Sequence, residues 1–265
     1  MNIFRQEFKS NLKSTIIWTI SIVGLIVLYM SLYPGFAKDA QMVKDMMANL
    51  PEPVRKGLGF NPDLFLSILG FYSFTFLYIL LLGSIQAMNL GISMLSKETR
   101  EKTADFLLTK PVTREQIVTA KLLSALTSLI ITNIVFIVVS YFTIELVKID
   151  DYKFNIFLMI SVTLFFVQLL FMSLGFILSV LISKIKSVIS ISLPIVFGFF
   201  IISMLGSVIG DELVSYITPF KYFDREHIIF HGTYETSYII LELVIIIVSI
   251  IATYIVYHFK DIHSI

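Results

Sequence analysis

The chain contains no cysteine among its 265 residues, and charged residues make up only 15% of it. Without cysteine, disulfide bonds, thiolate metal sites and a cysteine nucleophile are excluded. The sequence also lacks the G-x-x-x-x-G-K-[ST] loop, whose backbone amides and lysine hold nucleotide phosphates. We therefore expect that the chain does not hydrolyse ATP by itself in the usual way, and we predict no cofactor bound to it.

Signatures of an intramembrane enzyme are missing as well, since neither H-E-x-x-H nor G-x-S-x-G occurs. His227 and His231 are four residues apart with Glu226 and Glu235 nearby, which suggests a metal site. Two histidines alone are a weak pattern, however, and Gly232 would interrupt a helix there. We interpret them as ordinary loop residues and predict no metal and no catalytic residue. The positions of the basic residues are explained by the orientation of a membrane protein, and no separate basic patch remains, so nucleic-acid binding is not expected.

Long apolar runs are abundant, with 57% apolar residues, 14% aromatic residues and a mean hydropathy of +0.88. Each run is long enough to cross a hydrocarbon core of ~30 Å as a helix. The sequence predicts an all-α polytopic membrane protein of one domain, residues 1–265. The six expected spans are Thr15–Tyr33, Leu66–Leu95, Ile117–Ile144, Phe154–Ile182, Val188–Ile209 and Ser237–Tyr257.

The distribution of charge predicts the orientation of these spans. Six spans place both termini on one side, and assigning that side to the cytoplasm gives it most of the 20 basic residues, as the positive-inside rule requires. The first span lacks a small-residue cleavage site and is expected to be retained. The outer loops are then 34–63, the short loop 145–153, and 210–236, and aromatic residues in the third predict that it returns to the membrane interface.

The N-terminal residues 1–13 carry two parallel stripes at helical spacing, one apolar and one cationic. The stripes consist of Phe4, Phe8 and Leu12, and of Arg5, Lys9 and Lys13. This pattern is typical of a helix that lies at the membrane surface. The alternative is a basic tail that serves only the orientation rule.

Residues 97–112 form the longest charged segment between two apolar runs. Glu98 and Lys102 are spaced to support a short helix, and the step into Pro111 should end it. Thr113 and Gln116 then form a capping box for the next span. The apolar face of the short helix carries Ala104, Leu107 and Leu108, with Phe106 beside them. Such a helix fits a groove on a soluble partner, and the alternative is a solvated connector.

Polar residues inside the spans are candidates for a translocation path. They are Gln86, Asn89, Asn133, Gln168 and Glu242. The amides could line a path or join helices by hydrogen bonds. Because an intramembrane acid is costly and often functional, Glu242 supports an alternative function, namely an ion-coupled secondary transporter or channel.

Residues 101–114, EKTADFLLTKPVTR, followed by Lys121, resemble the signature loop of ABC-2 type transporter permeases. Lys102 stands where that family usually has glycine. The layout of six spans after a basic amphipathic start is similar across nearly the whole chain. The residues that match the loop are Thr103, Leu107, Leu108, Pro111, Val112, Thr113, Arg114 and Lys121.

This resemblance implies the membrane subunit of an ATP-driven exporter in a bacterial cell membrane. It implies pairing with a second permease, identical or homologous, and with two cytoplasmic ATPase subunits that hold ATP and Mg²⁺. The loop would be a coupling helix that docks into the ATPase. The implied cargo is a peptide, drug, lipid-like or other amphipathic molecule. The implied docking residues are Glu98, Glu101, Thr103, Ala104, Phe106, Leu107, Leu108, Pro111 and Arg114.

Overall fold

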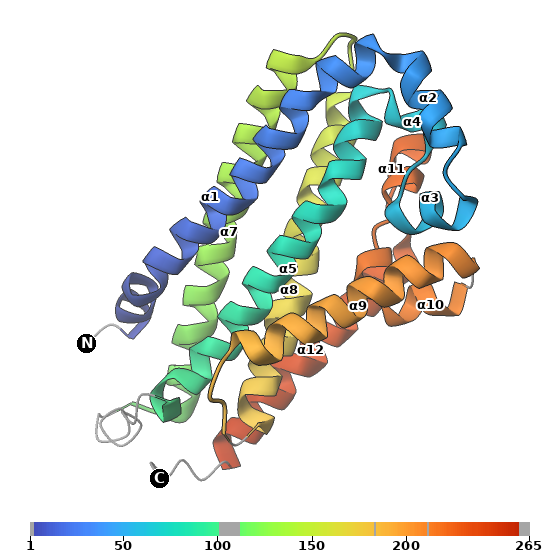
Figure 1. The fold of residues 1–265 in the computed structure, drawn as a ribbon. Coiled ribbons are helices and arrows are strands. Elements are labelled where there is room, and N and C mark those ends of the chain that lie inside the picture. The colour runs from blue at the N-terminus through green and yellow to red at the C-terminus, as the bar shows by residue number, and fades with distance from the viewer. Residues whose placement is uncertain (1–2, 101–111, 183, 211, 260–265) are drawn as a thin grey trace.

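The computed structural model describes residues 3–100, 112–182, 184–210 and 212–259. Within these ranges, six helices are long and apolar enough to cross a membrane, which confirms the predicted spans (Figure 1). No strand occurs in the described ranges, as the all-α prediction requires. The six helices are α1 (Ile3–Lys38), α5 (Ile68–Arg100), α7 (Arg114–Val147), α8 (Phe154–Leu181), α9 (Ile189–Ile209) and α12 (Thr236–Phe259).

The long helices extend beyond their apolar centres. The basic N-terminal segment and the first span form one helix, α1, so the predicted surface helix consists of its first turns. Hydropathy marks only the apolar middle because charged helix ends leave the hydrocarbon. At the start of α7 the predicted capping box is present. The backbone N–H of Gln116 donates to Thr113 Oγ1 at 3.2 Å, and the backbone N–H of Thr113 donates to Gln116 Oε1 at 3.1 Å.

Close backbone contact joins α5 to α8, the most extensively packed pair of helices, and α1 packs mainly on α7. A Cβ atom added to Gly175 would lie 2.8 Å from the carbonyl oxygen of Met88 and 3.0 Å from Gly91 Cα. A Cβ atom on Gly91 would overlap the carbonyl oxygen of Met172. Small residues bring membrane helices together in this way, since there is no hydrophobic driving force between helices in lipid.

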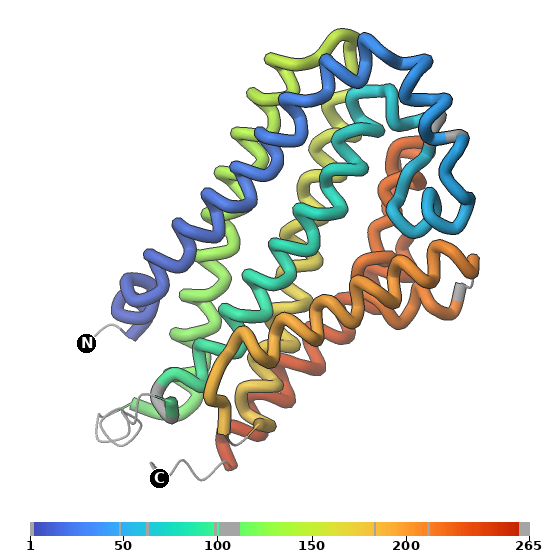
Figure 2. The backbone as a smooth tube through the Cα atoms, in the orientation of Figure 1, coloured from blue at the N-terminus to red at the C-terminus, as the bar shows by residue number. Residues whose placement is uncertain are grey.

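The two ends of the bundle differ in character. Figure 2 shows the beginning of α1 and the end of α12 at the same end, which we call the terminal end. The last residues of α5 and the first residues of α7 lie there too. The opposite end, which we call the far end, holds the short helices. They are α2 (Ala40–Ala48), α3 (Glu52–Leu58), α4 (Pro62–Phe65), α10 (Glu212–Ile217), the 3-10 helix η1 (Pro219–Lys221) and α11 (Arg225–His231).

The predicted loop 210–236 packs back against the sides of the long helices. The ring of Phe223 stacks on that of Phe166 in α8, with centroids 5.5 Å apart. Phe220 contacts Phe171 and Phe200 at the same centroid distance. Aromatic burial therefore holds η1 and α11 against α8 and α9. Contact of this loop with the membrane interface stays a prediction.

Candidate functional site

A polar pocket of about 500 Å³ lies between α1, α5 and the segment that leads into α9. Gln86 and Asn89 line it from α5, Asn11 and Trp18 from α1, and Lys186 from the segment before α9. Sites for small molecules typically have volumes of ~300–1,000 Å³. Amides and a lysine beside an indole ring can contact a molecule that has both polar and apolar parts.

Asn89 also fixes one wall of this pocket. Ser192 on α9 donates a hydrogen bond of 2.6 Å from its Oγ to Asn89 Oδ1. Figure 1 shows α9 diverging from α5 toward the far end, so this bond lies where the two helices are close. The bond therefore joins two helices that separate elsewhere.

Three of the predicted path residues form one buried cluster. Gln168 on α8 donates from Nε2 to Gln86 Oε1 at 3.0 Å and accepts from Asn133 Nδ2 on α7 at 2.6 Å. Gln86 donates to Thr132 Oγ1 at 3.0 Å, and the Thr132 hydroxyl lies 2.9 Å from that of Thr19 on α1. These bonds satisfy most of the buried polar groups of the cluster, Asn133 Oδ1 being without a partner among the described residues, and they join four helices. Only Gln86 belongs to both the cluster and the pocket lining.

Glu242 lies apart from this cluster, on α12, which packs mainly on α8. Only 4% of the residue is exposed, and its Oε1 atom has no hydrogen-bond partner among the described residues. Burial and then the charge of Glu242 raise the pKa of Tyr222, outside the spans, to about 12. The carboxylate therefore faces the interior of the chain rather than water, and its role in ion coupling stays a prediction.

A buried ion pair that the sequence did not predict joins α1 to α7 near the terminal end. Lys121 Nζ lies 3.1 Å from Glu7 Oε1 and donates to the carbonyl oxygen of Met94 on α5. Lys121 is fully buried and Glu7 is 7% exposed. Pairing and the carbonyl offset part of the cost of burying both charges, while Glu7 Oε2 has no hydrogen-bond partner among the described residues. The signal in the sequence was that Glu7 is the single acidic residue in the basic segment 3–13.

The residues expected to dock an ATPase fall mostly outside the described ranges. Those outside are Glu101, Thr103, Ala104, Phe106, Leu107, Leu108 and Pro111. Glu98 lies in the last turn of α5, and Arg114 begins α7. Arg114 Nη1 donates to the carbonyl oxygens of Tyr257 and His258, both at 3.0 Å. A cation is favourable at a helix C-terminus, so Arg114 fastens the start of α7 to the end of α12.

The N-terminal stripes keep their predicted separation on α1. Arg5, Lys9 and Lys13 are exposed, while the rings of Phe4 and Phe8 are half-buried and stack with centroids 6.2 Å apart. Leu12, the third apolar position, is 39% exposed. Contact of these residues with lipid headgroups stays a prediction.

The two histidines of the far end contact each other. The rings of His227 and His231 stack with centroids 4.3 Å apart, and His227 Nδ1 lies 3.9 Å from Glu235 Oε1. In the part of the chain that the structure describes, no group of three or more His, Cys, Asp or Glu residues could hold a metal ion.

Six membrane-spanning helices with a polar pocket among them define a polytopic helical membrane protein. The sequence model of the family described as "ABC-2 family transporter protein" matches residues 1–262. The chain therefore belongs to the ABC-2 family of transporter proteins, and it is a permease of an ABC transporter, a membrane transport component without its own ATPase. No curated protein matches the chain.

Proposed function

We propose that this permease exports an amphipathic substrate, such as a peptide, a drug or a lipid-like molecule, and is driven by a separate ATPase. Two permease subunits, identical or homologous, pair in the cell membrane and bind two cytoplasmic ATPase subunits, which hold ATP and Mg²⁺. The pocket of about 500 Å³ supports an amphipathic substrate, because its lining combines the amides of Gln86 and Asn89 with the apolar side chains of Trp18 and Leu90.

The terminal end faces the cytoplasm in this proposal. The pocket lies near that end, and Arg100 and Lys186 contribute positive charge to its lining. Cytoplasmic excess of Lys and Arg favours this orientation. A substrate would enter from the inner leaflet or the cytoplasm, with its apolar part against the indole and its polar part against the amides.

Residues 101–111 would couple the ATPase to the helices on either side. Lys121 joins α7 to α1 and α5 through Glu7 and Met94, and Arg114 joins α7 to the end of α12. Movement of a docked segment between α5 and α7 would therefore act on four helices together. Rigid-body rocking of packed helices is a common way to convert such a movement into opening on the other side.

The test is a reconstitution of the permease with an ATPase encoded beside it. We expect co-purification, ATP-dependent extrusion of a fluorescent amphipathic dye from proteoliposomes, and weaker dye-stimulated ATP hydrolysis in an Asn89→Leu variant. Gln41→Leu is the control, because Gln41 is an exposed amide on α2 that lies outside the pocket lining and outside the buried cluster. Equal loss in both variants would contradict the pocket as the substrate site.

A secondary transporter is the second candidate, because Glu242 is buried and its Oε1 lacks a hydrogen-bond partner among the described residues. An ion-coupled mechanism requires that Glu242→Gln abolish transport and that transport follow a proton gradient without ATP. The exporter proposal requires that transport in the same variant still depend on ATP.

A further inference from the structure

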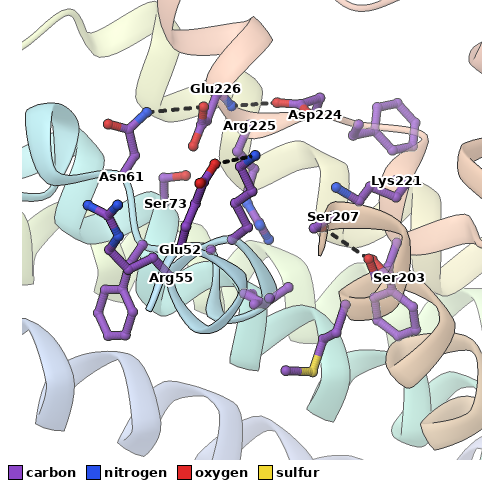
Figure 3. Close-up of a pocket in the computed structure, with 18 residues that line it drawn as sticks. Glu52, Arg55, Asn61, Ser73, Ser203, Ser207, Lys221, Asp224, Arg225 and Glu226 are labelled. Atoms are coloured by element: carbon purple, nitrogen blue, oxygen red, sulfur yellow. Dashed lines mark hydrogen bonds and ion pairs between the residues drawn. The ribbon is translucent and has the colours of Figure 1, made fainter. Parts of the chain in front are cut away.

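A second pocket, of about 440 Å³, lies at the far end (Figure 3). Its walls are α3 on one side and η1 with α11 on the other, and residues of α5 and α9 complete it. Four cationic side chains line it, Arg55, Lys56, Lys221 and Arg225, of which Figure 3 labels all but Lys56. Neither the family nor the proposed path assigns a role to this pocket, which we call the far-end pocket.

Two guanidinium groups in the far-end pocket have buried nitrogen atoms without a partner. Arg55 Nε and Arg225 Nη1 are shielded from solvent and have no hydrogen-bond partner among the described residues. Burial lowers the pKa of Lys221, and the positive charge of Arg225 lowers it further, whereas Asp224 and Glu226 act in the opposite direction. Such unsatisfied donors are rare in folded proteins, and an anion is the kind of ligand that accepts hydrogen bonds from them.

The carboxylates of the far-end pocket are engaged elsewhere. Glu52 pairs with Lys56 at 2.7 Å. Asp224 Oδ1 caps α11 by accepting from two backbone amides at 2.8 and 3.0 Å, and Glu226 Oε2 accepts from Asn61 Nδ2 at 3.2 Å. No ion pair between these acids and Arg55, Lys221 or Arg225 occurs in the described residues. The lining as a whole holds four cations against three carboxylates, so a net positive charge remains for a ligand.

The walls of the far-end pocket are held in place by close packing. A Cβ atom on Gly57 of α3 would lie 3.4 Å from Val208 of α9, so α3 rests directly on the last turns of that helix. Gly59 ends α3 with φ +72°, a conformation that favours glycine. A Cβ atom added there would lie 3.8 Å from Arg225 Nη2. The guanidinium of α11 thus lies over the turn that follows α3.

We propose that the far-end pocket binds a phosphate-type anion, either the headgroup of an anionic phospholipid or a soluble phosphate ester. Guanidinium groups match phosphate oxygens with paired hydrogen bonds, and the hydroxyl groups of Ser73 and Ser203 also line the pocket. The volume exceeds that of a bare ion and fits a phosphate that carries a substituent. The far-end pocket also adjoins the last turns of α9, and the ends of a span are where headgroups are expected. This site does not depend on the proposed transport cycle.

The test measures binding to the full chain in an uncharged detergent. Native mass spectrometry counts bound phosphatidylglycerol, with diacylglycerol as the phosphate-free probe, and thermal stability is measured with added glycerol 1-phosphate or inorganic phosphate. The variants are Arg55→Gln and Arg225→Gln. Lys44→Gln is the matched control, because Lys44 is exposed on α2 at the same end. Size-exclusion chromatography checks that each variant is folded.

We expect that the unaltered protein and Lys44→Gln bind at least one phosphate probe and not diacylglycerol. Each arginine variant should bind the phosphate probe at least about tenfold more weakly than the unaltered protein, because a charge-assisted contact is lost. Binding of phosphatidylglycerol alone would identify a headgroup, and binding of the soluble probes alone would identify a soluble ester. If Arg225→Gln does not fold, Arg55→Gln and the pocket-filling Ser207→Leu decide the question. The proposal is overturned if the unaltered protein binds no phosphate probe, or if the arginine variants bind the probe as tightly as the unaltered protein does.

Discussion

Lys121 and Glu7, 114 residues apart in the sequence, meet at 3.1 Å in the interior of the terminal end. Lys121 also donates to the carbonyl oxygen of Met94, so one ammonium group contacts α1, α5 and α7. Two of these helices, α5 and α7, flank residues 101–111 in the sequence. The ion pair therefore joins α1 to the two helices on either side of the connecting segment.

Loss of one partner of this pair should destabilise the protein strongly. We expect Lys121→Met or Glu7→Gln to lower the free energy of unfolding by about 3–5 kcal/mol, because the remaining charge is left buried without its partner. The combined Glu7→Leu and Lys121→Met variant should lose clearly less than the sum. Chemical unfolding in detergent, with exposed Lys13→Met as the control, measures these differences. Additive losses in the double variant would show that the charges do not interact.

The contact between Gly91 and Gly175 should tolerate no side chain. Alanine at Gly91 would overlap the carbonyl oxygen of Met172, so α5 and α8 must separate, at a cost of about 1–3 kcal/mol. Gly198→Ala is the control, because nothing lies within 4 Å of a Cβ atom there. Thermal unfolding of the purified variants measures the difference. Equal stability of Gly91→Ala and Gly198→Ala would refute the close approach.

The buried amide cluster should depend on Gln168. The Gln168→Leu variant leaves Asn133 Nδ2 without its side-chain acceptor and Gln86 Oε1 without its donor, so we expect a loss of about 1–3 kcal/mol. The control is Gln41→Leu, an exposed glutamine on α2. Comparison of the unfolding midpoints tests this. A midpoint for Gln168→Leu that equals the control would mean that the cluster does not join the helices.

The prediction that the segment between α5 and α7 docks into an ATPase is tested by placing acidic side chains at two of its apolar positions. Leu107→Asp with Leu108→Asp should abolish co-purification of the ATPase, because acidic side chains cannot enter an apolar groove. Membrane insertion should be retained, since the spans are unchanged. Lys184→Asp, an exposed change between α8 and α9, serves as the control. Retention of the ATPase by the double variant would place docking elsewhere.

Long apolar runs and local spacing predicted much of the fold. The six spans follow from hydropathy because a bilayer requires about 20 apolar residues per helix, whatever the rest of the chain does. The capping box at Thr113 and Gln116 is equally local, and it is present. The N-terminal basic segment was predicted as a helix, although not as part of a helix that continues to Lys38.

Contacts between distant residues could not be read from the sequence. Lys121 matched a family motif, but nothing in its neighbourhood identified Glu7 as the partner. The sequence could not show which polar residues of the spans join the buried amide cluster and which line the pocket near the terminal end. Their placement depends on which helices are neighbours. Likewise, Arg55 and Arg225 lie far apart in the sequence, and only the approach of α3 to α11 brings them to one pocket.

The most direct test of the account is the rate of ATP hydrolysis by a partner ATPase with and without this permease. Both would be reconstituted in lipid, and transport of a fluorescent amphipathic dye would be followed in parallel. We predict a stable complex, faster hydrolysis with the permease than without it, and dye transport that stops when the ATPase is inactivated. Absence of a complex, together with transport that continues without ATP and follows a proton gradient, would contradict the account.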